Sequence, residues 1–324
     1  MKKRVLVTEP IPDSVKQYLE EHVELDCWNN NEQMPREQLL KEIGNYHGLI
    51  TAKDAIDDEL LEQATQLEVV SNISVGYDNF DVDALQRHQI IATHTPYVLD
   101  ETVADLIFGL ILSSARRIPE LDQYVKQGQW DQSVGQPLFG QNVHHKKLGI
   151  IGMGRIGEKV ARRAKLGFQM DVSYYNRSRK KDVEDEWQIE YQSMDELLKS
   201  SDFILLMTPL TDETYHLIDK AAFSKMKSTS HFINAARGAV VDEQALIEAL
   251  ENNEIAGAGL DVFEQEPIDS ANPLLKMKQV VTLPHIGSAT SETREEMKFF
   301  AAKNMLQALH GETAEAIIKE LNQS

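Results

Sequence analysis

Three side chains able to transfer a proton or bind an anion lie in the second half of the sequence, each after a short apolar segment. Arg237 follows the segment 231–234, Glu266 follows 257–261, and His285 follows 279–283. Imidazole exchanges protons near neutral pH, a nearby carboxylate favours its charged form, and guanidinium binds carboxylates with paired hydrogen bonds. Taken singly, each residue also has a surface or structural explanation, and a lone Arg at a strand end is more often a surface ion-pair partner than a ligand-binding group. Their shared position after predicted strands, where open α/β sheets bind ligands, favours a reactive site.

A glycine-rich segment, KLGIIGMGRIG at 147–157, precedes these residues. Gly152, Gly154 and Gly157 have the spacing G-x-G-x-x-G, between an apolar strand and a helix-forming stretch. The first glycine allows a tight turn, the second lets a pyrophosphate approach the backbone, and the third lets the helix pack close to the strand. The spacing alone is weak evidence. The strand before it, the helix after it and a second apolar segment at 171–175 favour a dinucleotide-binding turn.

The rest of the sequence alternates short apolar segments with helical stretches, which predicts parallel sheets covered by helices. Strands are expected at 5–9, 23–27, 48–51, 67–72 and 90–95, and then at 147–151, 171–175, 203–207, 231–234, 257–261 and 279–283. One long helix is expected at 101–128, with Asp100 as its N-cap, and another at 291–310. We therefore predict an α/β protein with two doubly wound parallel-sheet domains: 99–290 binds a dinucleotide and is inserted into the domain formed by 1–98 and 291–324.

Composition narrows the range of partners. The 324 residues are 42% hydrophobic and 26% charged, with a net charge of −19 and no long basic run, so neither nucleic acid nor an anionic membrane is an expected partner. No apolar run is long enough to span a membrane, and the first 15 residues are typical of a strand rather than a signal peptide. Cys27 is the only cysteine and has no neighbouring His or Cys cluster, so neither a disulfide nor a metal site is expected. A cytoplasmic protein is the expectation.

At the level of whole motifs, the sequence resembles the D-isomer-specific 2-hydroxyacid dehydrogenase family, and within it the glyoxylate/hydroxypyruvate and 2-ketogluconate reductase branch. The marker stretches are SVGYDNFDVDA (74–84), GIIGMGRIG (149–157), INAARGAVVDEQAL (233–246), AGLDVFEQEP (258–267) and LPHIGSAT (283–290). The resemblance implies a Rossmann domain inserted into a flavodoxin-like substrate domain, and NAD(P)H-dependent reduction of short 2-keto acids to D-2-hydroxy acids. A phosphoglycerate-type dehydrogenase and a dinucleotide-sensing protein similar to the corepressors of this fold are the alternatives.

The resemblance also assigns residues to roles. His285 corresponds to the proton donor and acceptor, Glu266 to the carboxylate that tunes it, and Arg237 to the group that binds the substrate. The backbone of Val75 and Gly76 corresponds to the segment that holds the substrate carboxylate.

The choice of cofactor depends on the residues after the second strand of the dinucleotide domain. NAD-preferring domains place an acid there to bind the ribose 2′-hydroxyl, whereas this chain has Asn176, followed by Arg177, Ser178 and Arg179. No acid repels a 2′-phosphate, and the arginines could bind one, so NADP(H) is expected to be preferred and NAD(H) to be possible. The further residues assigned to the cofactor by the resemblance are Thr102, Gly152, Gly154, Arg155, Ile156, Gly157, Thr208, Pro209, Ala235, Ala236, Gly287 and Asp261, which would bind the nicotinamide carboxamide.

Relatives form homodimers through the long helix and the segment after it. The corresponding residues are 101–128 and 129–140, where Trp130, Leu138 and Phe139 are apolar in a loop-like context. A homodimer is expected, although these side chains could also pack within their own subunit.

Overall fold

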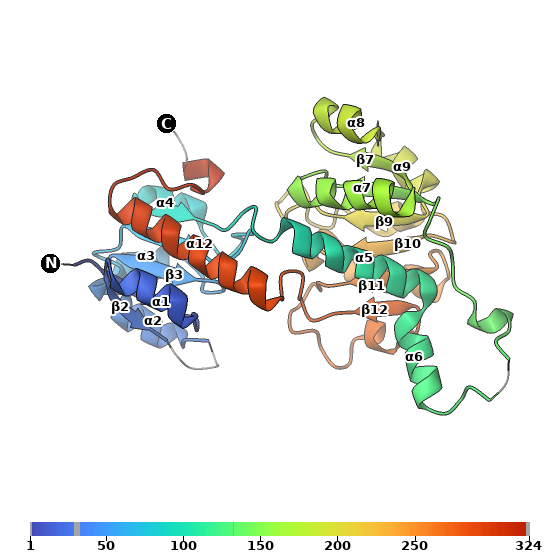
Figure 1. Cartoon of the computed structure of the whole chain (residues 1–324), viewed down its shortest axis with the longest axis horizontal. Coiled ribbons are helices and arrows are strands. Elements are labelled where there is room, and N and C mark those ends of the chain that lie inside the picture. Colours follow the sequence, from blue (N-terminus) through green and yellow to red (C-terminus); the bar gives the residue numbers. More distant parts are fainter. Residues whose placement is uncertain (1, 29–32, 132, 322–324) are drawn as a thin grey trace. The chain divides into compact units, whose positions relative to one another are not determined.

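The computed structural model describes residues 2–28, 33–131 and 133–321. The chain divides into two compact units, which we call the first unit (Met1–Leu99 and Ala289–Ser324) and the second unit (Asp100–Ser288) (Figure 1). Each unit is built on one sheet in which every paired strand is parallel. This confirms the predicted α/β class. In the described parts of the chain, no helix has both the length and the apolar content needed to cross a bilayer.

The first unit has a sheet of five strands in the order β2-β1-β3-β4-β5. The strands are β1 (Arg4–Val7), β2 (Glu24–Cys27), β3 (Gly48–Thr51), β4 (Val69–Asn72) and β5 (Ile91–Thr93). This is the strand order of flavodoxin-like sheets. The strands β3 and β4 are buried along their whole length, as expected for strands covered by helices on both faces.

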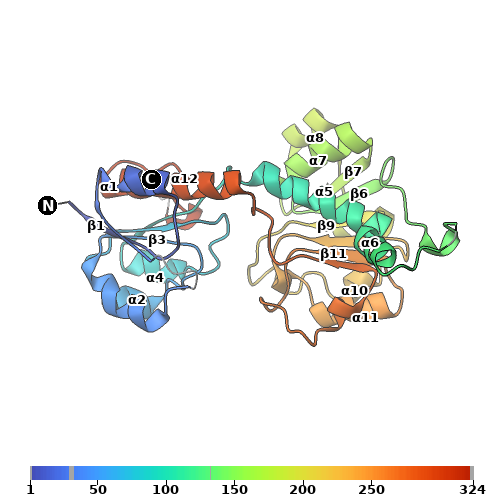
Figure 2. The same cartoon turned by 60° about the horizontal axis from the view of Figure 1, so that its bottom comes forward.

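Helices cover both faces of this first sheet (Figure 2). On one face lie α1 (Asp13–Glu20) and α12 (Ser291–Leu309), and on the other lie α2 (Arg36–Glu42), α3 (Asp58–Gln63) and α4 (Val82–Arg87). Short 3-10 turns follow at η1 (Ile43–Asn45) and η5 (Lys319–Leu321). The side chains of Asp57 and Asp81 accept hydrogen bonds from the first turns of α3 and α4, and this fixes where these two helices begin.

The second unit has seven strands in the order β12-β11-β10-β9-β6-β7-β8. They are β6 (Lys147–Ile151), β7 (Asp171–Tyr175), β8 (Glu190–Tyr191), β9 (Phe203–Leu206), β10 (His231–Asn234), β11 (Gly257–Leu260) and β12 (Val280–Thr282). Strands β6 to β11 have the Rossmann order, and β12 extends the sheet beyond β11. The sequence predicted six of these strands. It missed β8, which is only two residues long and has no apolar run.

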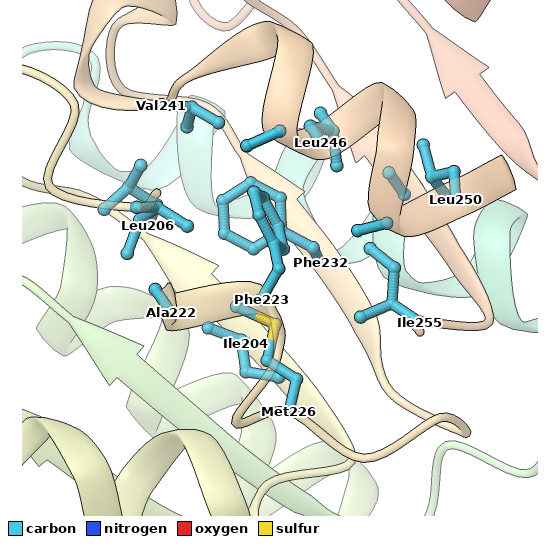
Figure 3. Close-up of a cluster of buried hydrophobic side chains, with 14 of the residues drawn as sticks. Ile204, Leu206, Ala222, Phe223, Met226, Phe232, Val241, Leu246, Leu250 and Ile255 are labelled. Atoms are coloured by element: carbon cyan, nitrogen blue, oxygen red, sulfur yellow. The ribbon is translucent and has the colours of Figure 1, made fainter. Parts of the chain in front are cut away.

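Helices again cover both faces of the second sheet. In Figure 2, α5 (Asp100–Arg116) and α7 (Arg155–Phe168) lie on one side of the sheet, and α10 (Lys220–Phe223) and α11 (Glu243–Glu251) lie on the other. The remaining elements are α8 (Lys181–Trp187), α9 (Met194–Ser200), η2 (Gln136–Leu138), η3 (Gly238–Val240) and η4 (Pro273–Lys276). Figure 3 shows the core beneath α10 and α11, where Phe223 and Phe232 meet edge to face at 5.4 Å. Burying each such ring contributes about 1.5–3 kcal/mol to the stability of the folded state. The cluster therefore helps to hold the ends of β9, β10 and β11 in place.

The prediction of one long helix at 101–128 is wrong, because the helix is interrupted at Arg117. Helix α5 ends at Arg116, Arg117 has a left-handed backbone (φ 55°), and α6 runs from Ile118 to Lys126. Pro119 has no N–H to donate to the carbonyl of Ala115, and that carbonyl accepts instead from the Gln141 N–H at 2.7 Å. Asp100 is the first residue of α5 rather than a cap before it. Its buried carboxylate accepts a hydrogen bond from Arg155 Nε at 3.1 Å.

Candidate active site

Three neighbouring strands of the second unit end in loops that carry the charged residues found in the sequence. Arg237 lies just after β10, Asp261 directly after β11 with Glu266 further along the same loop, and His285 shortly after β12. Since β10, β11 and β12 are adjacent and parallel, their carboxyl ends lie at one edge of the sheet. That edge is where open α/β sheets bind ligands.

His285 and Glu266 form a direct pair. His285 Nδ1 lies 2.7 Å from Glu266 Oε2, and the other carboxylate oxygen of Glu266 accepts from the Phe263 N–H at 3.1 Å. Both side chains are partly exposed. Burial raises the pKa of Glu266, but the hydrogen bonds from His285 and Phe263 and the charges of His285 and Arg237 outweigh it, so the pKa lies below its ordinary value. Glu266 is therefore ionised at neutral pH, with one ring nitrogen of His285 engaged.

The turn that carries Arg237 is fixed from inside the sheet by Asn234. The side chain of Asn234, 2% exposed, donates to the Arg237 carbonyl at 3.1 Å and accepts from the Ala236 N–H at 3.0 Å. The next residue, Gly238, lies against the backbone of Phe263, where an added Cβ would approach to 1.9 Å. Only glycine fits there, and its absence of a side chain lets the Arg237 turn pack directly on the loop that leads to Glu266.

Asp261 holds the loop around His285. Its carboxylate is 1% exposed and accepts from the Ile286 N–H at 2.8 Å. A Cβ added to Gly287 would lie only 3.2 Å from Asp261 Oδ2. Burial is the largest influence on the pKa of Asp261 and raises it, although hydrogen bonds from Ile286 and Gly287 and the charge of His285 oppose this. Asp261 thus fixes the backbone immediately after the histidine.

The three glycines of the predicted dinucleotide turn have three different surroundings. Gly152 has a left-handed backbone (φ 103°), and an added Cβ would lie 2.6–2.8 Å from the backbone of Met207 and Thr208. A Cβ at Gly157 would lie 2.8 Å from the Gly152 carbonyl, whereas a Cβ at Gly154 would meet nothing within 4 Å. Gly152 and Gly157 are therefore required by the fold. Gly154 faces open space at the start of α7, as a site for a pyrophosphate requires.

The residues after β7 make contacts that the sequence did not reveal. The side chain of Asn176 accepts from the Met153 N–H at 2.7 Å and donates to the Met153 carbonyl at 3.1 Å, so it holds the glycine turn in place. Arg177 pairs with Glu213 at 2.8 Å, and both side chains are largely exposed, at 81% and 70%. Ser178 is also exposed, and Arg179 pairs with Glu184.

The remaining predicted cofactor residues lie on the same unit. Thr208 and Pro209 follow β9, Ala235 and Ala236 follow β10, Arg155 and Ile156 begin α7, and Thr102 lies in the first turn of α5. Thr208 Oγ1 is buried and has no hydrogen-bond partner among the described residues. The open side of Gly154 and this buried hydroxyl beside the glycine turn both fit a bound dinucleotide. Val75 and Gly76 belong to the first unit, where they follow β4.

Comparisons with known proteins agree with this arrangement. Residues 108–287 match the family model described as "D-isomer specific 2-hydroxyacid dehydrogenase, NAD binding domain". A glyoxylate/hydroxypyruvate reductase B from an Enterobacter species is 48% identical over 311 residues, covering 96% of each chain. The crystal structure of an NADPH-dependent glyoxylate/hydroxypyruvate reductase from Sinorhizobium meliloti, in complex with NADP and malonate, is 30% identical with a TM-score of 0.86, covering 99% of this chain and 98% of that one.

A glyoxylate reductase from Paecilomyes thermophila is also 30% identical, with a TM-score of 0.89, covering 98% of this chain and 99% of that one. The similarity therefore extends over both units and not only over the dinucleotide-binding fold. This chain belongs to the D-isomer-specific 2-hydroxyacid dehydrogenase family, whose members are NAD(P)-dependent oxidoreductases.

Proposed function

We propose that this enzyme reduces short 2-keto acids, such as glyoxylate, hydroxypyruvate or 2-ketogluconate, to D-2-hydroxy acids. The observation that carries the proposal is the pair of His285 and Glu266, 2.7 Å apart, on loops beside the turn that carries Arg237. The names of the similar reductases support the class of substrate. In this proposal the second unit binds the dinucleotide and the first unit carries the loop that binds the substrate carboxylate.

NADPH, when bound, supplies a hydride to the keto carbon of the substrate. His285, in its protonated form, donates a proton to the oxygen of the same carbonyl group. Since Nδ1 of the ring is engaged by Glu266, the proton leaves from Nε2. Arg237 binds the substrate carboxylate and polarises the carbonyl, a task for which the planar guanidinium is better suited than an ammonium group. Asp261 keeps the His285 loop in place through the Ile286 N–H and would bind the carboxamide of the nicotinamide.

The proposal is tested by initial rates of NADPH and NADH oxidation with each of the three keto acids. Rapid turnover of at least one keto acid is the expected result. If the protein binds NADPH tightly but turns over none of them, it is a dinucleotide sensor or acts on a different substrate. Turnover of 3-phosphoglycerate in the oxidative direction, with none of the keto acids reduced, would favour the phosphoglycerate-type alternative.

For the cofactor, we propose that NADPH is preferred and that Arg177 binds its 2′-phosphate. An exposed ion pair is worth little, so the phosphate can replace Glu213 as the partner of Arg177. We expect Arg177→Gln to raise KM for NADPH about tenfold, the effect of losing one charge-assisted hydrogen bond. Glu213→Gln, which frees the arginine, is expected to lower it. KM for NADH is the internal control, and equal changes for both cofactors would contradict the assignment.

The glycine turn gives a second prediction, in which fold and binding can be separated. Gly154→Ala adds a Cβ that meets no protein atom within 4 Å, so the melting temperature should not change while Kd for NADPH rises at least tenfold. In Gly152→Ala, the alanine would have to adopt a left-handed backbone and its Cβ would clash with Met207. This should lower the free energy of unfolding by about 1–3 kcal/mol. Thermal melts and NADPH fluorescence titrations measure the two effects. A Gly154→Ala variant that binds NADPH normally would show that no pyrophosphate lies there.

We also propose that the enzyme is a cytoplasmic homodimer. In α6 and the segment after it, Ile118, Val125, Trp130, Val134 and Phe139 are each at least half exposed, and Gln132 lies outside the described residues. Such a group of apolar side chains is typical of a protein interface. The single cysteine fits a reducing compartment. Sedimentation that shows a monomer at micromolar concentration would rule out the dimer.

A further inference from the structure

The loop after β4 in the first unit is held in place through its backbone carbonyls. Three consecutive carbonyls each accept one hydrogen bond: Ser74 from Thr95 N–H at 2.9 Å, Val75 from His94 Nδ1 at 2.8 Å, and Gly76 from Asn72 Nδ2 at 2.8 Å. Because a carbonyl oxygen can only accept, Nδ1 of His94 carries the hydrogen in this contact.

Each of these bonds also fixes the direction of an N–H group. A carbonyl and the N–H of the next residue belong to one planar trans peptide and point in opposite directions. Holding the Val75 carbonyl therefore sets the direction of the Gly76 N–H, and holding the Ser74 carbonyl sets that of the Val75 N–H. In the described part of the chain, neither of these two N–H groups donates to any group. N–H groups left available in this way can donate hydrogen bonds to a carboxylate.

His94 is itself fixed by several contacts with its own unit. Its backbone N–H donates to the Ala316 carbonyl at 3.0 Å, and its ring packs edge to face against Tyr77 with the ring centres 5.3 Å apart. The hydroxyl of Tyr77 in turn donates to Glu320 at 3.1 Å. The C-terminal segment thus keeps the imidazole in a position to hold the Val75 carbonyl.

We propose that His94 is a positioning residue for the substrate: its Nδ1–H, through the Val75–Gly76 peptide, directs the Gly76 N–H at the carboxylate of the keto acid. This inference rests on the proposed function, because it takes the loop as the carboxylate-binding segment. His94 does not touch the reacting atoms. It should therefore act on substrate binding and leave hydride and proton transfer largely unchanged.

Two variants of similar size separate positioning from packing. His94→Leu removes the donor, whereas His94→Asn places an amide N–H close to the position of Nδ1. We expect His94→Leu to raise KM for the keto acid about tenfold, with kcat within twofold and KM for NADPH unchanged. His94→Asn should keep KM within about threefold of the unmodified enzyme. His88→Leu, at a histidine of the same unit that pairs with Asp58, is the matched control and should change neither constant.

The inference is overturned if His94→Asn raises KM as much as His94→Leu, if neither raises it, or if KM for NADPH rises in parallel. Should the Leu variant not fold, His94→Gln takes its place, since its longer amide cannot hold the Val75 carbonyl in the same position and should raise KM above that of His94→Asn. These outcomes presuppose an active unmodified enzyme. An unmodified enzyme that reduces no keto acid contradicts the proposed function itself, so the two failures are distinguishable.

Discussion

Replacing His285 with Asn is expected to lower kcat for keto-acid reduction by about 10²–10⁴-fold, the usual contribution of a positioned general acid. Asparagine places an amide N–H close to the position of Nδ1, so the contact with Glu266 at 2.7 Å can be kept in kind. What is lost is the transferable proton. Binding of NADPH, followed by fluorescence titration, should be unchanged, because the assigned task of His285 is proton transfer.

The chain offers a matched control in His216. Like His285, it has a left-handed backbone (φ 51° against 53°) and pairs with a glutamate, Glu264, at 3.1 Å. His216 pairs through Nε2, a position that the longer Gln amide can occupy, and His216→Gln should leave kcat within twofold. If both variants lose activity equally, the loss comes from disturbing a histidine–glutamate pair in general. The assignment of His285 as the proton donor would then be wrong.

Replacing Arg237 with Lys is expected to lower kcat/KM for the keto acid by about 10²–10³-fold, although the charge is kept. Asn234 and Gly238 fix the backbone of the turn that carries Arg237 and pack that turn against the loop that leads to Glu266. A lysine ammonium is a point charge that cannot make two parallel hydrogen bonds to a carboxylate. The loss should appear in both kcat and KM, since Arg237 is assigned to binding and to polarising the carbonyl.

Arg87→Lys is the control for this substitution, because Arg87 pairs with Asp58 in an exposed ion pair of the first unit. It should retain full activity. A kcat/KM for Arg237→Lys within threefold of the unmodified enzyme would mean that a positive charge alone suffices. It would contradict the assignment of two parallel hydrogen bonds from Arg237 to the substrate carboxylate.

The class of fold and most of its strands could be predicted from the sequence because buried parallel strands are continuous apolar runs between helices. Segments such as FILL of β9 and GLIT of β3 are buried along their whole length and are visible as such. The two-residue strand β8 has no such run, since only pairing with β7 defines it. The break at Arg117 was missed because Pro119 is compatible with the first turn of a helix, and the position of that first turn depends on the Gln141 contact.

The charged residues of the site could be identified because they follow predicted strands. Their partners could not, because the contacts join residues distant in sequence. The pairing of Arg177 with Glu213 spans 36 residues, and that of His285 with Glu266 spans 19. Asn176 was assigned to the cofactor, and the structure adds its two hydrogen bonds to Met153 of the glycine turn.

The roles of three residues that position the site could not be assigned from the sequence. Asn234 ends β10 as a buried polar residue, and Gly238 is one glycine among 17, so only the tertiary contacts distinguish them. His94 similarly is one of ten histidines, and its contact with the Val75 carbonyl depends on β4 and β5 lying side by side. These residues affect the reaction only by holding the backbone of other residues in position, so their own types and spacing in the sequence do not indicate their role.

The most direct test of the central claim is the pH dependence of kcat/KM for keto-acid reduction, measured for the unmodified enzyme and for Glu266→Gln. The pKa of Glu266 is lowered, so its negative charge is present throughout the neutral range and supports the protonated form of His285. Removing that charge should move the alkaline decline of activity to lower pH. An unchanged pH profile in the Gln variant would contradict the account, because Glu266 would then have no part in supplying the proton.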